Sequence, residues 1–210
     1  MNVGGDSWRR LWGELGAGEI PGGVYNQLVA ACSERHRHYH TLQHLRECLA
    51  HFEAAAPLAR HPAEVELALW FHDAVYDPRR HDNEELSAGW AQRTVVGAGC
   101  DAAIAGRVHA LVMATKGHSA SDDPDTALLL DVDLAILGAA GARFQEYERQ
   151  VRAEYAHVPD AEFHRGRAAV LAGFEARPRI YLTAPFHDAL EARARANLRQ
   201  SQERLKTLLP

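Results

Sequence analysis

The chain has 210 residues, which suits one hydrophobic core, since a single core can grow to roughly 250 residues. The hydrophobic fraction of 47% is ordinary for a globular protein, and the net charge of -5 argues against a general nucleic-acid binder, which would carry a basic patch. No apolar run approaches about 20 residues, so no membrane span is expected, and the N-terminus lacks the apolar core of a signal peptide. The three cysteines form no Cys-x-x-Cys pair, which favours a reduced, cytoplasmic protein. The 13 histidines stand out, because histidine is the commonest metal ligand.

Helical periodicity and helix-boundary residues predict an all-α protein of about nine or ten helices. Asp6 is expected to cap the first helix, and a loop rich in glycine over residues 16–23 separates it from the second. Thr41, or a residue just before it, starts the third helix. Pro62 suits the first turn of the fourth helix, which is expected to continue to about residue 75.

Further helices are predicted along the rest of the chain, and strand signals are scarce. Asn83 is expected to cap one helix and Asp101 the next. A strongly apolar segment over residues 126–137 forms another helix, which Gly138 ends. Three amphipathic helices follow, over residues 142–156, 160–176 and 186–208.

The most informative stretch is the apolar run over residues 67–71, which leads directly into His72 and Asp73. Burying an imidazole beside a carboxylate is costly unless something pairs them, and a divalent metal ion is one such partner. The alternative is a helix end at which both side chains point to water.

His40 and His44 are four residues apart, so they share one face of a helix. One ring can then offer a nitrogen to a metal ion and the other can offer a nitrogen to a bound substrate. The alternative is a pair of partly exposed histidines on a polar edge.

Asp131 and Asp133 lie inside the apolar segment over residues 126–137. A buried carboxylate needs a charge partner or several hydrogen-bond donors, or else its pKa rises. Residues two apart do not share a helix face, so only one of the two is expected at a common site. A capping role and a buried ion pair with an arginine are the alternatives to metal ligation.

In this order, these residues resemble the HD superfamily of metal-dependent phosphohydrolases, and within it the small group described as predicted metal-dependent HD phosphohydrolases. The similar stretches cover nearly the whole chain, at residues 37–45, 70–78, 82–85, 114–116, 130–138 and 179–183. A lone His-Asp pair is a weak signal. A second pair, His187 and Asp188, has no apolar run before it and no late aspartate after it, so we interpret it as a helix start.

The resemblance implies the metal ligands residue by residue. The first histidine ligand matches His44, the His-Asp pair matches His72 and Asp73, and the late aspartate best matches Asp133, with Asp131 as its rival. The implied cofactor is a divalent metal ion, with Mn, Mg, Co, Ni, Fe and Zn as candidates.

The resemblance also implies catalytic groups. In the cyclic-nucleotide phosphodiesterases of the superfamily, a histidine ahead of the metal ligand protonates the leaving oxygen, and His40 matches that position. In the alarmone hydrolases, the pair continues as His-Asp-x-x-Glu-Asp. Asp77 matches the last carboxylate and could orient the attacking water, but Tyr76 replaces the glutamate, so alarmone hydrolysis does not transfer directly.

Several charged residues are candidates for contact with a phosphorylated substrate. Lys116 and His118, in a loop after a helix, could bind phosphate oxygens, or could simply place positive charge at a helix C-terminus. Arg37 and Arg79 are similar candidates, with a surface position as the alternative. Glu84 is a further candidate at the substrate, or only favours a helix N-terminus.

The resulting hypothesis is a hydrolase that cleaves a phosphoester or phosphoanhydride of a nucleotide with a metal-activated water. It is expected to form a single HD-type domain over residues 1–210, with a metal-site core at about residues 36–138 and C-terminal helices over 140–208 packed on it. Its partners would be a small phosphorylated molecule and, through arginine-rich helices, a second copy in a homodimer. The alternatives are a catalytically silent metal-containing regulatory or nucleotide-binding module, and a helical interaction protein. A di-iron oxygenase would need further ligands, for which His109 and His118 are the candidates.

Overall fold

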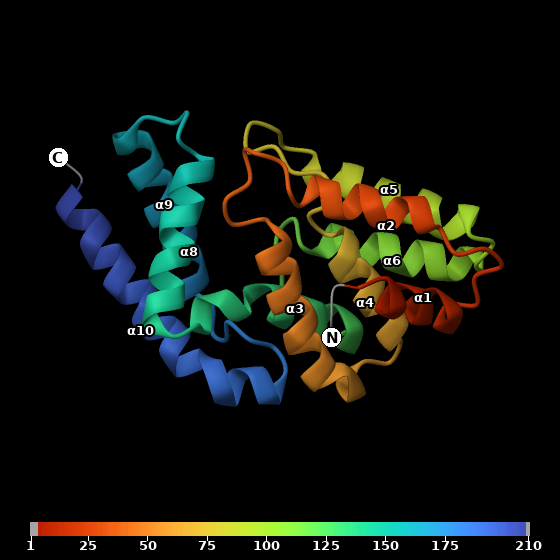
Figure 1. The fold of residues 1–210 in the computed structure, drawn as a ribbon. Coiled ribbons are helices and arrows are strands. Elements are labelled where there is room, and N and C mark those ends of the chain that lie inside the picture. The colour runs from red at the N-terminus through yellow and green to blue at the C-terminus, as the bar shows by residue number, and fades with distance from the viewer. Residues whose placement is uncertain (1–3, 209–210) are drawn as a thin grey trace. The chain divides into compact units, whose positions relative to one another are not determined.

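The computed structural model describes residues 4–208, and Figure 1 shows them as an all-helical chain. Within these residues there are ten α-helices, two short 3-10 helices and no strand, so the predicted all-α class is confirmed. None of the helices between residues 4 and 208 combines the length and the apolar character that crossing a membrane requires.

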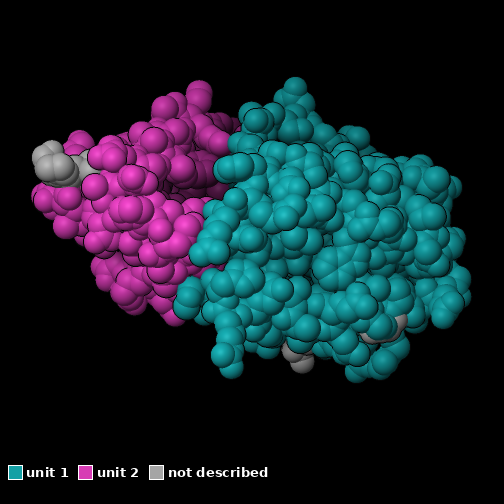
Figure 2. All heavy atoms as spheres, turned by 90° about the horizontal axis from the view of Figure 1, so that it is seen from above, with its two compact units in different colours: residues 1–133 teal, residues 134–210 magenta. Residues whose placement is uncertain are grey.

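The chain divides into two compact units, Met1–Asp133 and Leu134–Pro210, coloured teal and magenta in Figure 2. The first unit contains η1 (Ala56–Leu58) and the helices α1 (Gly5–Glu14), α2 (Gly22–Ala31), α3 (Leu42–Ala55), α4 (Pro62–Phe71), α5 (Asn83–Gly97), α6 (Ala102–Ala114) and α7 (Pro124–Asp133). The second unit contains η2 (Leu134–Gly138), α8 (Gly141–Glu154), α9 (Asp160–Glu175) and α10 (Ala184–Leu208). The expectation of a single domain over residues 1–210 stays a prediction.

Helix α4 is the centre of the first unit. All of its residues from Glu64 to Phe71 are buried, and it packs against α1, α3, α5, α6 and α7. A helix that is apolar on all sides must be surrounded in this way. Its buried acidic residues are paired, since Glu66 accepts from Arg10 at 2.7 Å and Glu64 accepts from Arg107 at 2.6 Å. The two acidic residues buried in α4 are therefore neutralised by arginines of α1 and α6.

Three predicted helix boundaries are confirmed. Thr41 is the N-cap of α3 and accepts the backbone N–H of Gln43 at 3.2 Å. Asp101 is the N-cap of α6 and accepts the N–H of Ala103 at 2.7 Å. Pro62 is the first residue of α4, where its missing N–H costs no hydrogen bond.

Two predicted caps are wrong. Gly4 is the N-cap of α1, and Asp6 lies inside the first turn, where its charge suits the helix N-terminus. Asp82 is the N-cap of α5, while the side chain of Asn83 closes the preceding turn. Asn83 accepts from the N–H of Asp77 at 3.1 Å and donates to the carbonyl of Asp77 at 2.9 Å.

Two predicted helix lengths are also wrong, and both errors fall at the candidate site. Helix α4 ends at Phe71 rather than near residue 75, so His72 is its C-cap. The segment over residues 126–137 is not one helix, because α7 ends at Asp133 and the chain tightens into η2.

The second unit is organised around η2, which packs against α10 and α8. Tyr181 donates to the carbonyl of Leu134 at 3.0 Å, and Asn197 donates to the carbonyl of Leu137 at 2.8 Å. Gly138 is required for close packing, because a Cβ there would lie 2.7 Å from the Cβ of Leu190.

Candidate metal centre

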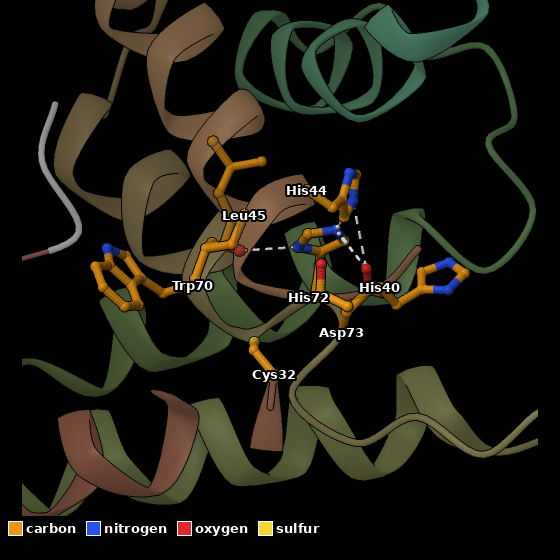
Figure 3. A pocket seen from close by; sticks show the side chains of 9 residues that line it. Cys32, His40, His44, Leu45, Trp70, His72 and Asp73 are labelled. Carbon is orange, nitrogen blue, oxygen red and sulfur yellow. Dashed lines mark hydrogen bonds and ion pairs between the residues drawn. The ribbon is translucent and has the colours of Figure 1, made fainter. Parts of the chain in front are cut away.

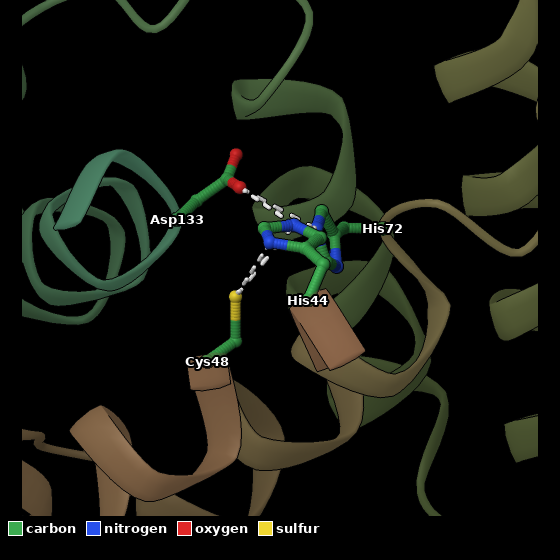
Figure 4. Close-up of side chains that lie close together, drawn as sticks. All are labelled: His44, Cys48, His72 and Asp133. Atoms are coloured by element: carbon green, nitrogen blue, oxygen red, sulfur yellow. Dashed lines mark hydrogen bonds and ion pairs between the residues drawn. The ribbon is translucent and has the colours of Figure 1, made fainter. Parts of the chain in front are cut away.

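Four side chains from three parts of the first unit converge at one point (Figures 3 and 4). His44 lies in the first turn of α3, His72 and Asp73 directly follow α4, and Asp133 is the last residue of α7. The Nε2 atoms of His44 and His72 are 3.1 Å apart. Asp73 Oδ2 lies 3.0 Å from His72 Nε2 and 3.4 Å from His44 Nε2. Asp133 Oδ1 lies 3.2 Å from His44 Nε2 and 3.5 Å from His72 Nε2.

These separations match those between ligands of a single metal ion. Nitrogen and oxygen ligands lie about 2.1 Å from zinc, which places neighbouring ligands about 3.4 Å apart in a tetrahedral site and about 3.0 Å apart in an octahedral one. The five measured separations range from 3.0 to 3.5 Å. Five of the six pairs among these four atoms therefore have the spacing of neighbouring ligands of one ion.

Two atoms of the cluster, one on His72 and one on Asp73, are left able to bind a cation by the hydrogen bonds around them. His72 Nδ1 donates to the carbonyl of Leu69 at 2.8 Å, so in the neutral ring Nε2 carries the lone pair. Asp73 Oδ2 is buried and accepts no hydrogen bond of good geometry. Buried polar atoms nearly always have a partner, and a cation would supply one here.

The imidazoles and carboxylates of the cluster shift one another's pKa values. Burial lowers the pKa of His72, but the carboxylates of Asp73 and Asp133 outweigh burial and raise that pKa well above its usual value. Burial also opposes ionisation of both carboxyl groups, yet the imidazoles hold their pKa values well below the usual range. The two carboxylates thus attract positive charge to this point, which protons on the imidazoles or a divalent ion can supply.

Cys48 adds a thiol that the sequence analysis missed. It lies four residues after His44 on α3, and its Sγ is 3.6 Å from His44 Nδ1 and 3.7 Å from His44 Nε2 (Figure 4). Ligand atoms of Cys48, His44, His72 and Asp133 all lie within 4.8 Å of one another, so this group could hold a metal ion. The i, i+4 spacing from His44 was the signal that could have revealed it.

Of the two aspartates in the apolar segment, Asp133 is the one placed between the imidazoles of His44 and His72. Asp131 is fully buried. The other oxygen of Asp133, Oδ2, lies 2.8 Å from Nε2 of His118. The sequence had suggested that His118 contacts phosphate, whereas the structure places its ring on an acidic residue of the cluster.

His40 lies beside the cluster and lines the same small pocket. Cys32, Trp70, His44, His72 and Asp73 line it as well (Figure 3). The half-buried ring of His40 stacks on Tyr76, with ring centroids 4.0 Å apart. Its ring centroid lies 6.0 Å from that of His44.

Arg37 is an internal residue, which corrects the expectation of a surface position. Its side chain is 0% exposed. The guanidinium donates to the carbonyl of Asp73 at 2.6 Å, to the carbonyl of Ala74 at 3.0 Å and to the carboxylate of Glu34 at 2.9 Å. It fixes the turn after α4, and this commitment leaves the substrate role suggested for it without geometric support.

Three other candidate residues make contacts away from the converging atoms. Asp77 Oδ1 accepts from the N–H of Arg79 at 2.9 Å within a turn. Lys116 is exposed and forms an ion pair with Glu85. Glu84 lies half-buried in the first turn of α5, where negative charge suits the helix N-terminus. Their roles in catalysis or substrate binding stay predictions.

Comparison with known proteins gives no independent assignment. No protein-family model matches the chain, and searches of curated proteins and of solved structures found no match either. The site must therefore be interpreted from its residues and geometry.

Proposed function

We propose that this protein is a metal-dependent phosphohydrolase of the HD superfamily that cleaves a phosphoester or phosphoanhydride of a nucleotide. The observation that carries the proposal is the convergence of His44, His72, Asp73 and Asp133: the two imidazole nitrogens lie 3.1 Å apart and 3.0–3.5 Å from the carboxylate oxygens. These four residues are the ones that the motif resemblance assigns to the metal, and they come from segments far apart in the sequence.

The residues present fit a divalent ion held by two imidazole nitrogens and two carboxylate oxygens. Such an ion supplies a Lewis acid for a phosphoryl oxygen and acidifies a bound water toward neutral pH. His72 is kept in the ligating tautomer by its Nδ1–H bond to Leu69, and Arg37 holds the backbone at Asp73. The protein thus prepares the ligands before the ion arrives, which suits chemistry that depends on positioning.

His40 is the residue we assign to proton transfer. It lines the pocket beside the cluster, and Tyr76 and Tyr39 pack against its ring with centroids 4.0 and 4.9 Å away. Two aromatic neighbours restrict the orientation of the imidazole. A ring nitrogen of His40 can then donate a proton to the leaving oxygen of a phosphoester, a general-acid step that contributes typically about 10²–10⁴-fold.

The second candidate function is a catalytically silent metal-containing module that binds a nucleotide or regulates a partner. One observation favours it: two cations expected to contact phosphate are engaged by the protein. Lys116 pairs with Glu85, and Arg37 is buried against backbone carbonyls. Turnover, rather than metal binding, distinguishes the two functions.

The test is a screen of nucleotides and simple phosphoesters with Mn, Co, Mg, Ni and Fe added separately. We expect turnover with at least one metal, and its loss in His72→Ala and Asp73→Ala with the helical content retained. His187→Ala is the matched control, because His187 belongs to the second His-Asp pair, whose carboxylate at Asp188 is exposed. Metal binding without turnover of any substrate would support the silent module. Turnover that survives His72→Ala would contradict the proposal.

A further inference from the structure

Asp133 uses its two carboxylate oxygens differently. Oδ1 lies 3.2 Å from His44 Nε2 and 3.5 Å from His72 Nε2, whereas Oδ2 lies 2.8 Å from His118 Nε2. An ionised carboxylate can only accept a hydrogen bond, so Nε2 of His118 carries the hydrogen of this bond. A bond of this length to a charged acceptor is among the stronger kinds found in proteins.

The backbone of His118 is held in a conformation that few residues other than glycine adopt. Its φ angle is +46°, in the left-handed region, and its N–H donates to the carbonyl of Ala114 at 3.2 Å as α6 ends. Such backbone strain persists only where the surroundings fix it, and it clusters at functional sites. Here the strained residue is the one whose side chain contacts Asp133.

We propose that His118 is a positioning residue that makes Asp133 a metal ligand through Oδ1 alone. This inference rests on the proposed metal site and goes beyond the four ligands assigned there. A carboxylate can bind a cation with one oxygen or with both. The bond to His118 turns Oδ2 toward that ring and leaves Oδ1 as the carboxylate oxygen that faces the two imidazoles. A coordination position is thereby kept for water or for a phosphoryl oxygen.

This role differs from phosphate contact, the function that the sequence suggested for His118. The side chain of His118 is 21% exposed and that of Asp133 is 13% exposed, so their bond is largely shielded from water. Residues that orient metal ligands from outside the coordination shell typically change metal affinity by about 10- to 100-fold. Their effect depends on the hydrogen-bond donor rather than on charge.

The experiment is a Co²⁺ titration of the full chain, followed by visible absorption, for wild type, His118→Ala and His118→Gln. The amide nitrogen of glutamine can occupy the place of Nε2, whereas alanine provides no donor. We expect His118→Ala to weaken Co²⁺ binding by about 10- to 100-fold and to change the absorption spectrum of the bound ion. His118→Gln should restore both toward wild type. Melting of the metal-free proteins shows whether the fold is kept.

Two further variants keep the outcome decisive. His118→Asn tolerates the left-handed backbone but has a shorter amide, so it should behave like His118→Ala even if the alanine variant does not fold. His81→Ala is the matched control, an exposed histidine outside the cluster, and should bind Co²⁺ like wild type.

The failure of this inference can be distinguished from the failure of the metal site itself. If wild type binds no Co²⁺, both are overturned. If wild type binds Co²⁺ and His44→Ala does not, the metal site stands. Wild-type affinity and spectrum in His118→Ala, or a glutamine variant no better than alanine, would then overturn the positioning role alone.

Discussion

His72 and Asp73 are consecutive in the chain, yet His72 Nε2 and Asp73 Oδ2 lie only 3.0 Å apart. Helix α4 ends at Phe71, His72 is its C-cap, and Asp73 lies in the following turn. Arg37 donates to the carbonyl of Asp73 and so holds the backbone at which these two side chains converge.

Arg37→Ala should destabilise the protein and weaken its metal site. The buried guanidinium donates to the carbonyls of Asp73 and Ala74, and its loss leaves both without that donor. We expect the free energy of unfolding to fall by about 2–3 kcal/mol, measured in urea at an unchanged m-value. Arg79→Ala, at an exposed site, should change it by less than about 0.5 kcal/mol. Equal stability of the two variants would mean that Arg37 does not hold the turn.

Asp133→Asn and Asp131→Asn should separate the two aspartates of the apolar segment. Asp133 has an oxygen beside both imidazoles, so its amide variant should lose most of its affinity for a divalent ion. Asp131 is buried on a different face of α7, and its variant should keep the metal stoichiometry of wild type even if it is less stable. Equilibrium dialysis with Co²⁺ measures both. Loss of metal in Asp131→Asn alone would reverse the assignment.

Metal binding should release protons near neutral pH. Burial lowers the pKa of His72, but the carboxylates outweigh burial and raise it well above its usual value, which favours the protonated imidazole in the metal-free protein. Burial lowers the pKa of His44, but the Cys48 thiol and other neighbours raise it well above its usual value too. Because only neutral imidazole ligates, we expect release of up to about two protons per ion. Calorimetric titration in two buffers of different ionisation enthalpy measures this number, and identical heats would contradict the expectation.

The metal-free protein should draw most stability from this cluster in mildly acidic solution. The raised pKa of each imidazole stabilises the fold fully below the unfolded value of about 6.5, and the effect is lost as pH rises through the folded pKa. The lowered pKa of Asp73 and Asp133 stabilises the fold above the unfolded value of about 3.9, and this effect is lost as pH falls through the folded pKa. The decrease in the free energy of unfolding caused by Asp133→Asn should therefore be largest between about pH 4 and 6.5. Thermal melting of chelator-treated wild type and variant across this pH range measures the decrease. A loss that does not vary with pH would argue against charge pairing in the cluster.

Local sequence signals predicted most of the fold. Trp8, Leu11 and Trp12 of α1 recur at helical spacing in the sequence, and all three are buried. The caps at Thr41 and Asp101 could be predicted because each is a bond between a side chain and a backbone group two residues away. The turn after α4 could not be predicted in this way, because the guanidinium that holds it belongs to Arg37, which lies 36 positions before Asp73.

The sequence motifs predicted the metal ligands of the candidate site but not the residues that position those ligands. The ordered histidines and aspartates indicated His44, His72, Asp73 and Asp133, and the structure brings them together. Periodicity could not choose between the two late aspartates, because both lie in one apolar segment. The contact of His118 with Asp133 could not be predicted either, because it requires a left-handed backbone conformation at His118 in a polar loop.

Metal analysis of the purified protein shows whether His44, His72, Asp73 and Asp133 hold a cation together. Protein prepared without chelator, or reconstituted with Co²⁺ or Mn²⁺, should hold at least one divalent ion per chain by elemental analysis. His72→Ala and Asp133→Ala should lose that ion while retaining the helical circular-dichroism spectrum of wild type. A wild-type protein that binds no divalent ion, or variants that bind it as tightly as wild type, would mean that these four side chains do not form a metal site.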